Sequence, residues 1–346
     1  MTDGSAQPPG DGSRRRDRRV RPDSPPADAA GDPSAVLHAH LRAARSEFEN
    51  QVARTRADFE EANERLKERT GRDLILAILI GLAIGAVLIA SLIIWKPVFL
   101  ILAGAAAILG VFEFTRALQV AGRRVDLVPQ LFGAAALLLS AWFFGDWLHW
   151  VVLWAVVTVV VVWRLLGQMV ARDGRRYADV WDDVVTGVLV QLYVPFLASL
   201  CVVLLRQDRG EWWVLAFIII AAAADTGAYA TGLTLGKHPM APRISPKKTW
   251  EGFAGAVLAA LVAGVLLAAL MLHLPWGTGL LIGAVILATA TVGDLGESMI
   301  KRDLGIKDMS SWLPGHGGVL DRLDSILPSA GAALALYYLL TPLVTQ

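Results

Sequence analysis

Length, composition and charge already exclude several classes of protein. The chain has 346 residues, of which 55% are hydrophobic and 18% charged, whereas soluble domains carry about 25% charged residues. Its 32 Lys and Arg residues balance 31 Asp and Glu residues, so the chain lacks the basic excess of a nucleic-acid-binding protein and we expect no nucleic-acid partner. The single cysteine, Cys201, excludes a disulfide framework and a cysteine-rich metal site.

The first 72 residues differ from the rest of the chain. Residues 1–33 are rich in Pro, Gly, Ser, Asp and Arg, and we expect a disordered tail because they cannot bury enough apolar surface to fold. Its arginine run at 14–19 is either a contact for anionic lipid or a solvated stretch balanced by aspartates. Residues 34–72 place apolar side chains at spacings of three and four, which predicts an amphipathic cytoplasmic helix. This helix is either a short coiled coil or a helix lying on the membrane surface.

Apolar segments of roughly 20 residues, the length that crosses a bilayer core, occupy most of the remaining chain. We place them at 73–94, 98–116, 127–145, 148–166, 184–205, 211–230, 253–274, 277–295 and 325–343. The predicted fold is therefore an all-α polytopic membrane protein with about nine transmembrane helices. We divide it into N-terminal transmembrane helices at 73–220 and a C-terminal region at 221–346, where polar residues concentrate.

The distribution of Lys and Arg predicts the orientation. The connections after the second, fourth, sixth and eighth segments hold 15 of these residues, and the other four connections hold 3. Because basic loops stay in the cytoplasm, we expect a multi-pass protein of the cell membrane with its N-terminus and its charged loops in the cytoplasm.

Two pairs of glycines, Gly81/Gly85 and Gly279/Gly283, have the spacing that lets membrane helices approach closely. This spacing is common by chance, so it indicates helix packing and says nothing about function.

Carboxylates collect in the second half of the chain, inside or beside apolar segments. They are Asp225, Glu251, Asp294, Glu297, Asp303, Asp308, Asp321 and Asp324. A charge at bilayer depth costs at least about 2.5–3.5 kcal/mol. These groups must therefore be paired, bound to a metal, or placed in a wet cavity.

Two of the polar clusters are ambiguous by themselves. Asp225 lies in Ala-Asp-Thr-Gly-Ala-Tyr and is either a metal or base ligand or a helix-end carboxylate paired with a lysine. The second cluster reads Ser-Pro-Lys-Lys-Thr-Trp-Glu from Ser245 to Glu251. Two lysines with hydroxyl neighbours before a helix suit phosphate oxygens. The alternative is an ordinary basic loop in which Ser245 or Thr249 caps the next helix.

The third cluster, from Gly293 to Asp324, is the richest. If the eighth helix continues through Lys301, then Asp294, Glu297, Ser298 and Lys301 share one of its faces. A glycine-rich turn around His316 then returns Asp321 and Asp324, three residues apart, toward that face. Hard oxygen ligands without cysteine suit Mg²⁺ bridging phosphates better than zinc.

From Ser298 to Asp324 the chain reads S-x-I-K-R-x4-K-D-x-S-x2-L-P-G-H-G-G-V-x-D-R-x-D. This resembles the signature of the phosphatidate cytidylyltransferase (CDP-diacylglycerol synthase) family, and the two earlier clusters are similar to that family's segments in the same order. The resemblance implies that CTP and phosphatidate give CDP-diacylglycerol and pyrophosphate in a bilayer-embedded enzyme that needs Mg²⁺. It also implies a homodimer as one expected assembly. A second cation, monovalent or divalent, is left open. The catalytic region implied by the resemblance is 221–346.

The resemblance also assigns residues. The expected metal ligands are Asp294 and Asp321, with Mg²⁺ bridging the CTP phosphates. The expected catalytic residues are Lys301, Arg302, Lys307, Asp308, His316, Arg322 and Asp324. The expected substrate-binding residues are Asp225, Ser245, Lys247, Lys248, Thr249, Glu251, Glu297 and Ser298.

Two other functions stay open at this point. A CTP-dependent kinase of a lipid alcohol would use similar substrates but release CDP. A transporter would also keep charges within its spans, although here they gather at one end of the late segments.

Overall fold

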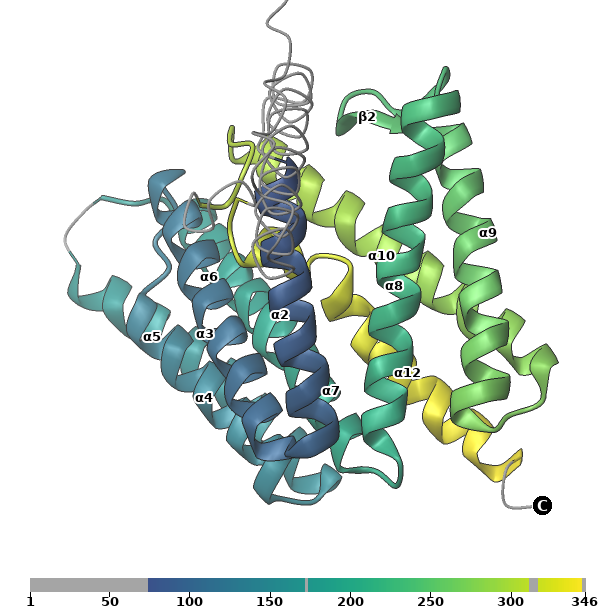
Figure 1. The fold of residues 1–346 in the computed structure, drawn as a ribbon. Helices are drawn as coiled ribbons and strands as arrows, with labels where there is room; N and C mark the ends of the chain where they lie inside the picture. Colours follow the sequence, from purple (N-terminus) through teal and green to yellow (C-terminus); the bar gives the residue numbers. More distant parts are fainter. Residues whose placement is uncertain (1–73, 172–173, 311–316, 344–346) are drawn as a thin grey trace, which may run out of the picture. The chain divides into compact units, whose positions relative to one another are not determined.

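The computed structural model describes residues 74–171, 174–310 and 317–343 (Figure 1). The tail predicted at 1–33, the amphipathic helix predicted at 34–72 and His316 lie outside the described residues.

Helical units follow each of the predicted apolar segments in turn. They are α2 Leu74–Ile94, α3 Lys96–Val120, α4 Leu127–Phe143, α5 Asp146–Val170, the continuous unit of α6 Tyr177–Gln191, η1 Leu192–Phe196 and α7 Leu197–Arg206, α8 Gly210–Leu235, α9 Trp250–Leu267 with η2 Ala268–Leu272, α10 Trp276–Asp303, and α11 Leu320–Leu323 followed by α12 Ile326–Leu340 and η3 Thr341–Leu343.

Seven units in the described part of the chain are long and apolar enough to cross a membrane. The other two are shorter apolar helices, namely α4 and the Gly85–Ile94 part of α2. Large apolar side chains such as Ile101, Phe132 and Leu270 stay exposed on the outer faces, and lipid is the environment that covers such a surface. The prediction of an all-α polytopic membrane protein is confirmed.

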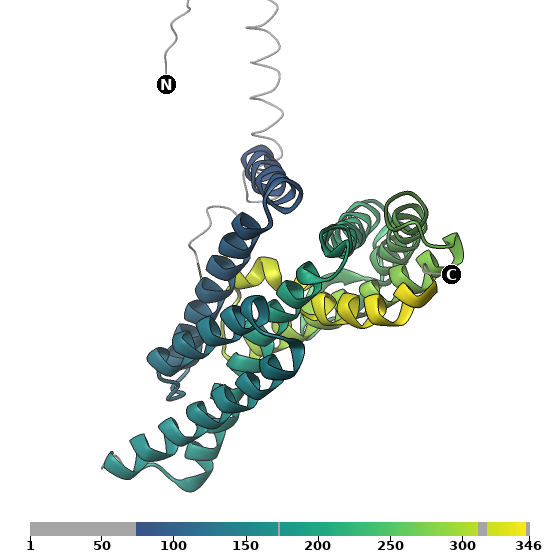
Figure 2. The same ribbon diagram turned by 90° about the horizontal axis from the view of Figure 1, so that it is seen from below.

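The buried apolar side chains form two main clusters, which meet along α7. One cluster joins α7, α8, α9, α10 and α12, and the other joins α3, α4, α7 and the residues around α11. Helix α7 contacts α4 on one side and α8 and α12 on the other. Figure 2 shows the same division, with α3 to α6 gathered away from α8 and α9. The core thus connects the N-terminal helices directly to those that carry the late polar clusters.

Buried polar side chains bridge the N-terminal helices. Gln191 Nε2 donates to Gln130 Oε1 over 2.6 Å, which links α6 to α4. The ring nitrogens of His149 contact the hydroxyls of Ser140 and Ser199 at 2.8 and 3.1 Å, which links α5 to α4 and α7. Such hydrogen bonds hold helices together in lipid, where apolar burial provides little driving force between them. These residues therefore have a structural role.

Of the two glycine pairs, only Gly279/Gly283 mediates close packing. A Cβ atom on Gly283 would lie 2.5 Å from the carbonyl oxygen of Ala260, and one on Gly279 would lie 2.5 Å from that of Gly264. Helices α9 and α10 therefore touch through their backbones. Nothing in the described part of the chain lies within 4 Å of a Cβ built on Gly81 or Gly85.

Gly283→Ala should therefore lower the thermal unfolding midpoint in detergent, because the added methyl pushes against backbone and overpacking costs about 1–3 kcal/mol. Gly85→Ala is the matched control, since it adds the same methyl to a membrane helix without a close neighbour. Equal midpoints for the two variants would contradict the close packing of α9 and α10.

Candidate functional site

A two-stranded hairpin, which the sequence did not predict, separates α8 from α9. Its strands β1 Pro239–Ala241 and β2 Ser245–Thr249 pair in antiparallel fashion. Thr249 Oγ1 accepts a hydrogen bond from Gly252 N at 3.1 Å and so caps α9. Arg302 Nε at the end of α10 donates to the carbonyl of Ile244 at 3.2 Å. The hairpin is thus held at the ends of α9 and α10.

A cavity of about 210 Å³ opens between this hairpin and helices α8, α9 and α10. Small apolar side chains such as Ala228, Ala256 and Ala290 form much of its wall. Its polar lining residues are Asp225, Lys247, Lys248, Thr249, Thr291 and Asp294. Five of these were predicted site residues. They are spread over a stretch of 70 residues, from Asp225 to Asp294, and the fold brings them to one cavity. A cavity with charges of both signs beside an apolar wall suits a ligand with phosphates and an apolar part.

The predicted polar face of α10 is present, because the helix continues to Asp303. Ser298 Oγ donates to Asp294 Oδ1 at 3.4 Å, and Lys301 Nζ lies 3.2 Å from Glu297 Oε1. Glu297 is fully buried. Asp294 also forms an ion pair with Lys248 of the hairpin. Lys248 of the loop thus meets a carboxylate of α10, and the phosphate-binding role of the loop stays a prediction.

Asp321 accepts hydrogen bonds from several parts of the signature segment, which runs from Ser298 to Asp324. Its Oδ1 accepts from Lys301 Nζ at 2.8 Å, and its Oδ2 accepts from the backbone nitrogens of Met309 and Gly318 at 3.0 and 2.7 Å. Gly317 has a φ of +80°, and a Cβ there would lie 2.9 Å from Asp321 Oδ2. Glycine is needed at this position for both its backbone angle and its small size.

Three carboxylates come near one another around Ser325. Ser325 N donates to Asp324 Oδ1 at 2.7 Å, and its hydroxyl donates to Asp225 Oδ2 at 3.4 Å. Asp294 lies near enough to both aspartates for their charges to repel, while Lys248 attracts Asp225. Negative charge therefore concentrates where α8, α10 and the α11–α12 junction meet.

The remaining predicted residues lie around this centre. Glu251 accepts from the backbone nitrogens of Lys237 and His238 at 3.1 and 3.2 Å, so it ties the end of α8 to α9 and does not line the cavity. Ser245 lies in β2 outside the cavity lining, and Lys307, Asp308 and Arg322 are exposed. Their catalytic and binding roles stay predictions.

Glu113, on α3, is a residue that the sequence analysis missed. Its carboxylate accepts from the Ser310 hydroxyl at 2.5 Å and from the backbone nitrogens of Val319 and Leu320 at 3.0 and 2.9 Å. Only 2% of Glu113 is exposed. One buried carboxylate thus holds the segment that carries Asp321, from a helix about 200 positions earlier. A lone acidic residue within an apolar segment was the signal that could have found it.

Tyr193 is a second residue missed. It lies in the π-helical segment η1, where Pro195 interrupts regular helix bonding. Its buried hydroxyl has no hydrogen-bond partner in the described part of the chain, and the charges that act on it are those of Glu297, Asp324 and Asp294. Single-turn π-bulges are frequent at functional sites.

Comparison with known proteins now identifies the family. The model of the cytidylyltransferase family matches residues 75–340. The chain belongs to this family. It is 41% identical over 271 residues to the phosphatidate cytidylyltransferase of Mycobacterium bovis, covering 77% of this chain and 88% of that relative. The enzyme of the same name from Haemophilus influenzae is 32% identical over 276 residues, covering 72% and 93%. The chain is therefore a nucleotidyltransferase.

The donor set fits the Mg²⁺ expected for this family only in part. In the described residues, no three His, Cys, Asp or Glu side chains form a ready-made metal group. Both oxygens of Asp321 are occupied by Lys301 and backbone nitrogens, so Lys301 would have to move for Asp321 to ligate a metal. The mutually repelling Asp225, Asp294 and Asp324 supply the hard oxygen donors that Mg²⁺ prefers. Asp294 is engaged as well, with Ser298 on one oxygen and Lys248 on the other, so Lys248 would have to move for Asp294 to ligate a metal.

Glu113→Gln should loosen the signature segment. The amide nitrogen of glutamine would face backbone N–H groups, which also donate, and a buried donor left without an acceptor costs about 1–3 kcal/mol. We expect faster amide hydrogen exchange in a peptide covering 317–323. Glu211→Gln, in the first turn of α8 and in an ion pair with Lys96, is the control that removes a carboxylate elsewhere. Unchanged exchange in the Glu113 variant would show that this carboxylate does not hold the segment.

Proposed function

We propose that the chain transfers the cytidylyl group of CTP to phosphatidate, forming CDP-diacylglycerol and pyrophosphate. The observation that carries this proposal is the cavity where Lys247, Lys248 and Thr249 of the hairpin line the same space as Asp294 of α10, beside an apolar wall. The names of the relatives support the choice of phosphatidate as the lipid substrate.

The reaction needs little covalent help from the protein. The phosphate monoester of phosphatidate is already an anionic nucleophile, and its oxygen attacks the α-phosphorus of CTP. The bond between that phosphorus and the oxygen bridging to the β-phosphorus breaks, and pyrophosphate leaves with the electron pair. The barrier comes from bringing two polyanions together and from charge growing on the leaving group. Positioning and electrostatic stabilisation should therefore dominate.

The chain's own residues meet these needs from several elements. Lys247 and Lys248 would bind the nucleotide phosphates at the cavity mouth, with the Ser245 and Thr249 hydroxyls beside them. Lys301, held by Glu297 and Asp321 at 3.2 and 2.8 Å, is oriented to offset negative charge at the centre. The exposed Arg302, Lys307 and Arg322 would attract the incoming anions. His316 and Asp308 belong to the same proposal without an assigned step.

Asp294, with Asp225 and Asp324 beside it, would hold Mg²⁺. When bound there, the ion would withdraw negative charge from the phosphate oxygens. In this proposal Asp321 serves chiefly to hold Lys301 and the glycine turn. It ligates the metal only if Lys301 moves.

The membrane arrangement is part of the same proposal. The excess of basic residues in alternate connections, 15 against 3, supports placing the hairpin and the signature segment on the cytoplasmic side of the cell membrane, where CTP is available. Phosphatidate would enter from the bilayer with its acyl chains still in lipid. The resemblance to the family also supports a homodimer.

Purified full-length protein in nonionic detergent should release pyrophosphate only when CTP, phosphatidate and Mg²⁺ are all present. Asp294→Asn should lower kcat/KM by about 100-fold or more, because a preorganised charge at the reaction centre is lost. It should also raise the Mg²⁺ concentration that gives half-maximal rate.

Asp179→Asn is the matched control, since it neutralises a half-exposed aspartate that pairs with Arg176 and does not line the cavity. It should keep the wild-type rate. Release of CDP in place of pyrophosphate would contradict cytidylyl transfer and favour a lipid-alcohol kinase. A folded Asp294 variant with wild-type turnover and Mg²⁺ dependence would contradict the metal assignment.

A further inference from the structure

The signature segment contains two consecutive glycines, and each lies against a different carboxylate. A Cβ atom on Gly317 would lie 2.9 Å from Asp321 Oδ2, and one on Gly318 would lie 2.7 Å from Glu113 Oε2. Real side chains do not come this close, so both positions need glycine. The φ of Gly317 is +80°, whereas that of Gly318 is not positive. Gly318 is therefore needed chiefly because Glu113 takes the space of a side chain.

The backbone that follows the first glycine is shared between the same two carboxylates. The backbone nitrogen of Gly318 donates to Asp321 Oδ2 at 2.7 Å. The next two nitrogens, of Val319 and Leu320, donate to Glu113 Oε1 and Oε2 at 3.0 and 2.9 Å. Both carboxylates are buried. A displacement of Glu113 would therefore move the backbone whose N–H group holds Asp321.

Asp321 transmits this constraint to Lys301. One oxygen of Asp321 accepts from Gly318 N, and the other accepts from Lys301 Nζ at 2.8 Å. Both side chains of this ion pair are nearly buried, with exposed fractions of 11% for Lys301 and 4% for Asp321. Glu113 thus holds the backbone, the backbone holds Asp321, and Asp321 orients the ammonium group of Lys301.

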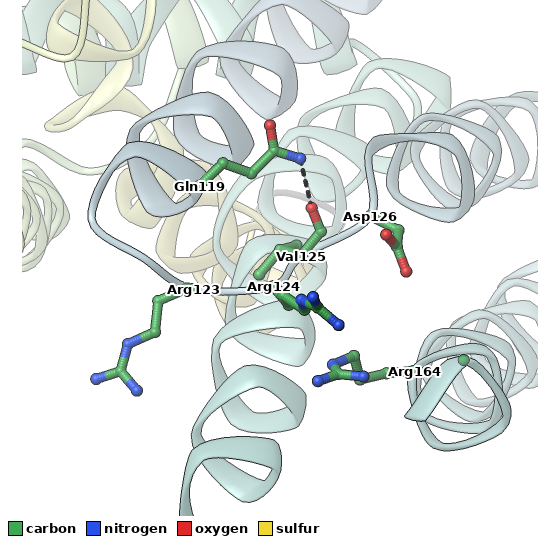
Figure 3. A pocket seen from close by; sticks show the side chains of 7 residues that line it. Gln119, Arg123, Arg124, Val125, Asp126 and Arg164 are labelled. Atoms are coloured by element: carbon green, nitrogen blue, oxygen red, sulfur yellow. Dashed lines mark hydrogen bonds between the residues drawn. The ribbon is translucent and has the colours of Figure 1, made fainter. Parts of the chain in front are cut away.

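Helix α3 is a firm support for Glu113. Figure 3 shows the turn after this helix, where Gln119 Nε2 donates to the carbonyl of Val125 at 2.7 Å. Phe114, next to Glu113, is fully buried, and its ring packs edge-on against that of Tyr193 with 6.2 Å between centroids. The helix is thus fixed both at its end and beside the carboxylate. Close packing of this kind resists small displacements.

We propose that Glu113 is a positioning residue for cytidylyl transfer, which acts through Gly318 and Asp321 on the orientation of the Lys301 ammonium group. The inference rests on the proposed function, because that reaction is where the orientation of Lys301 has its effect. A helix in the first part of the chain would then control turnover at a site formed by the late helices.

Steady-state pyrophosphate release by the full-length protein in nonionic detergent tests the inference. Glu113→Gln should lower kcat by about 10-fold or more, since a misplacement of about 1 Å can cost about 100-fold in rate. The KM for CTP should change little, because the hairpin lysines proposed to bind the nucleotide are not held by Glu113. Glu211→Gln, which removes a carboxylate in the first turn of α8, should keep both wild-type constants.

Alanine at the two glycines separates the contact with Glu113 from a general loosening of the segment. Gly318→Ala should lower kcat in the wild-type background. It should have little further effect in a Glu113→Ala background, because the carboxylate that its methyl group would meet is then absent. Gly317→Ala is the matched control. It should lower kcat in both backgrounds, because its methyl group meets Asp321 and its φ is positive.

Two results would overturn the positioning role while leaving the proposed function intact. One is a wild-type kcat in Glu113→Gln. The other is an equal loss of kcat from Gly318→Ala in both backgrounds, since its effect would then not pass through Glu113. A wild-type protein that releases no pyrophosphate from CTP and phosphatidate would contradict the proposed function itself, and the inference with it.

Discussion

The ion pair between Lys301 and Asp321, 2.8 Å long and almost fully buried, is the interaction on which the site depends. An unpaired charge at membrane depth costs at least about 2.5–3.5 kcal/mol. Here each charge has the other as a partner, and Lys301 has Glu297 as well, at 3.2 Å. Because Asp321 also accepts from Met309 and Gly318, the pair fixes the glycine turn as well as the end of α10. The bonds that satisfy these buried polar groups thus also set the geometry of the site.

A buried carboxylate of the N-terminal helices also holds this part of the site. Glu113 reaches from α3 to the backbone at the start of α11, so the signature segment is held from two sides. The early helices therefore do more than anchor the protein in lipid, since they supply one of the two carboxylates that fix the signature segment. Tyr193 of η1 also carries a buried hydroxyl that has no hydrogen-bond partner in the described part of the chain. Both residues lie before 221, and the bounds 221–346 of the catalytic region stay a prediction.

Much of the fold could be predicted because each helix is specified locally. Apolar length located the spans, and helical periodicity placed Asp294, Ser298 and Lys301 on one face. The hairpin could not be predicted, because its strands are three and five residues long and are held by contacts to α9 and α10. Glu113 stands out in the sequence as a lone acidic residue in an apolar segment, but its partners could not be predicted, because they include backbone nitrogens about 200 positions away. The ambiguity at Thr249 is resolved in part, since it both caps α9 and lines the cavity.

Position-specific labelling of CTP distinguishes transfer of its α-phosphorus to the lipid from transfer of its γ-phosphorus. Vesicles containing phosphatidate and the full-length protein would be incubated with CTP labelled at either the α- or the γ-phosphorus. We expect the α label in the lipid fraction and the γ label in the released pyrophosphate. Recovery of the γ label in lipid, with the α label left in CDP, would contradict cytidylyl transfer.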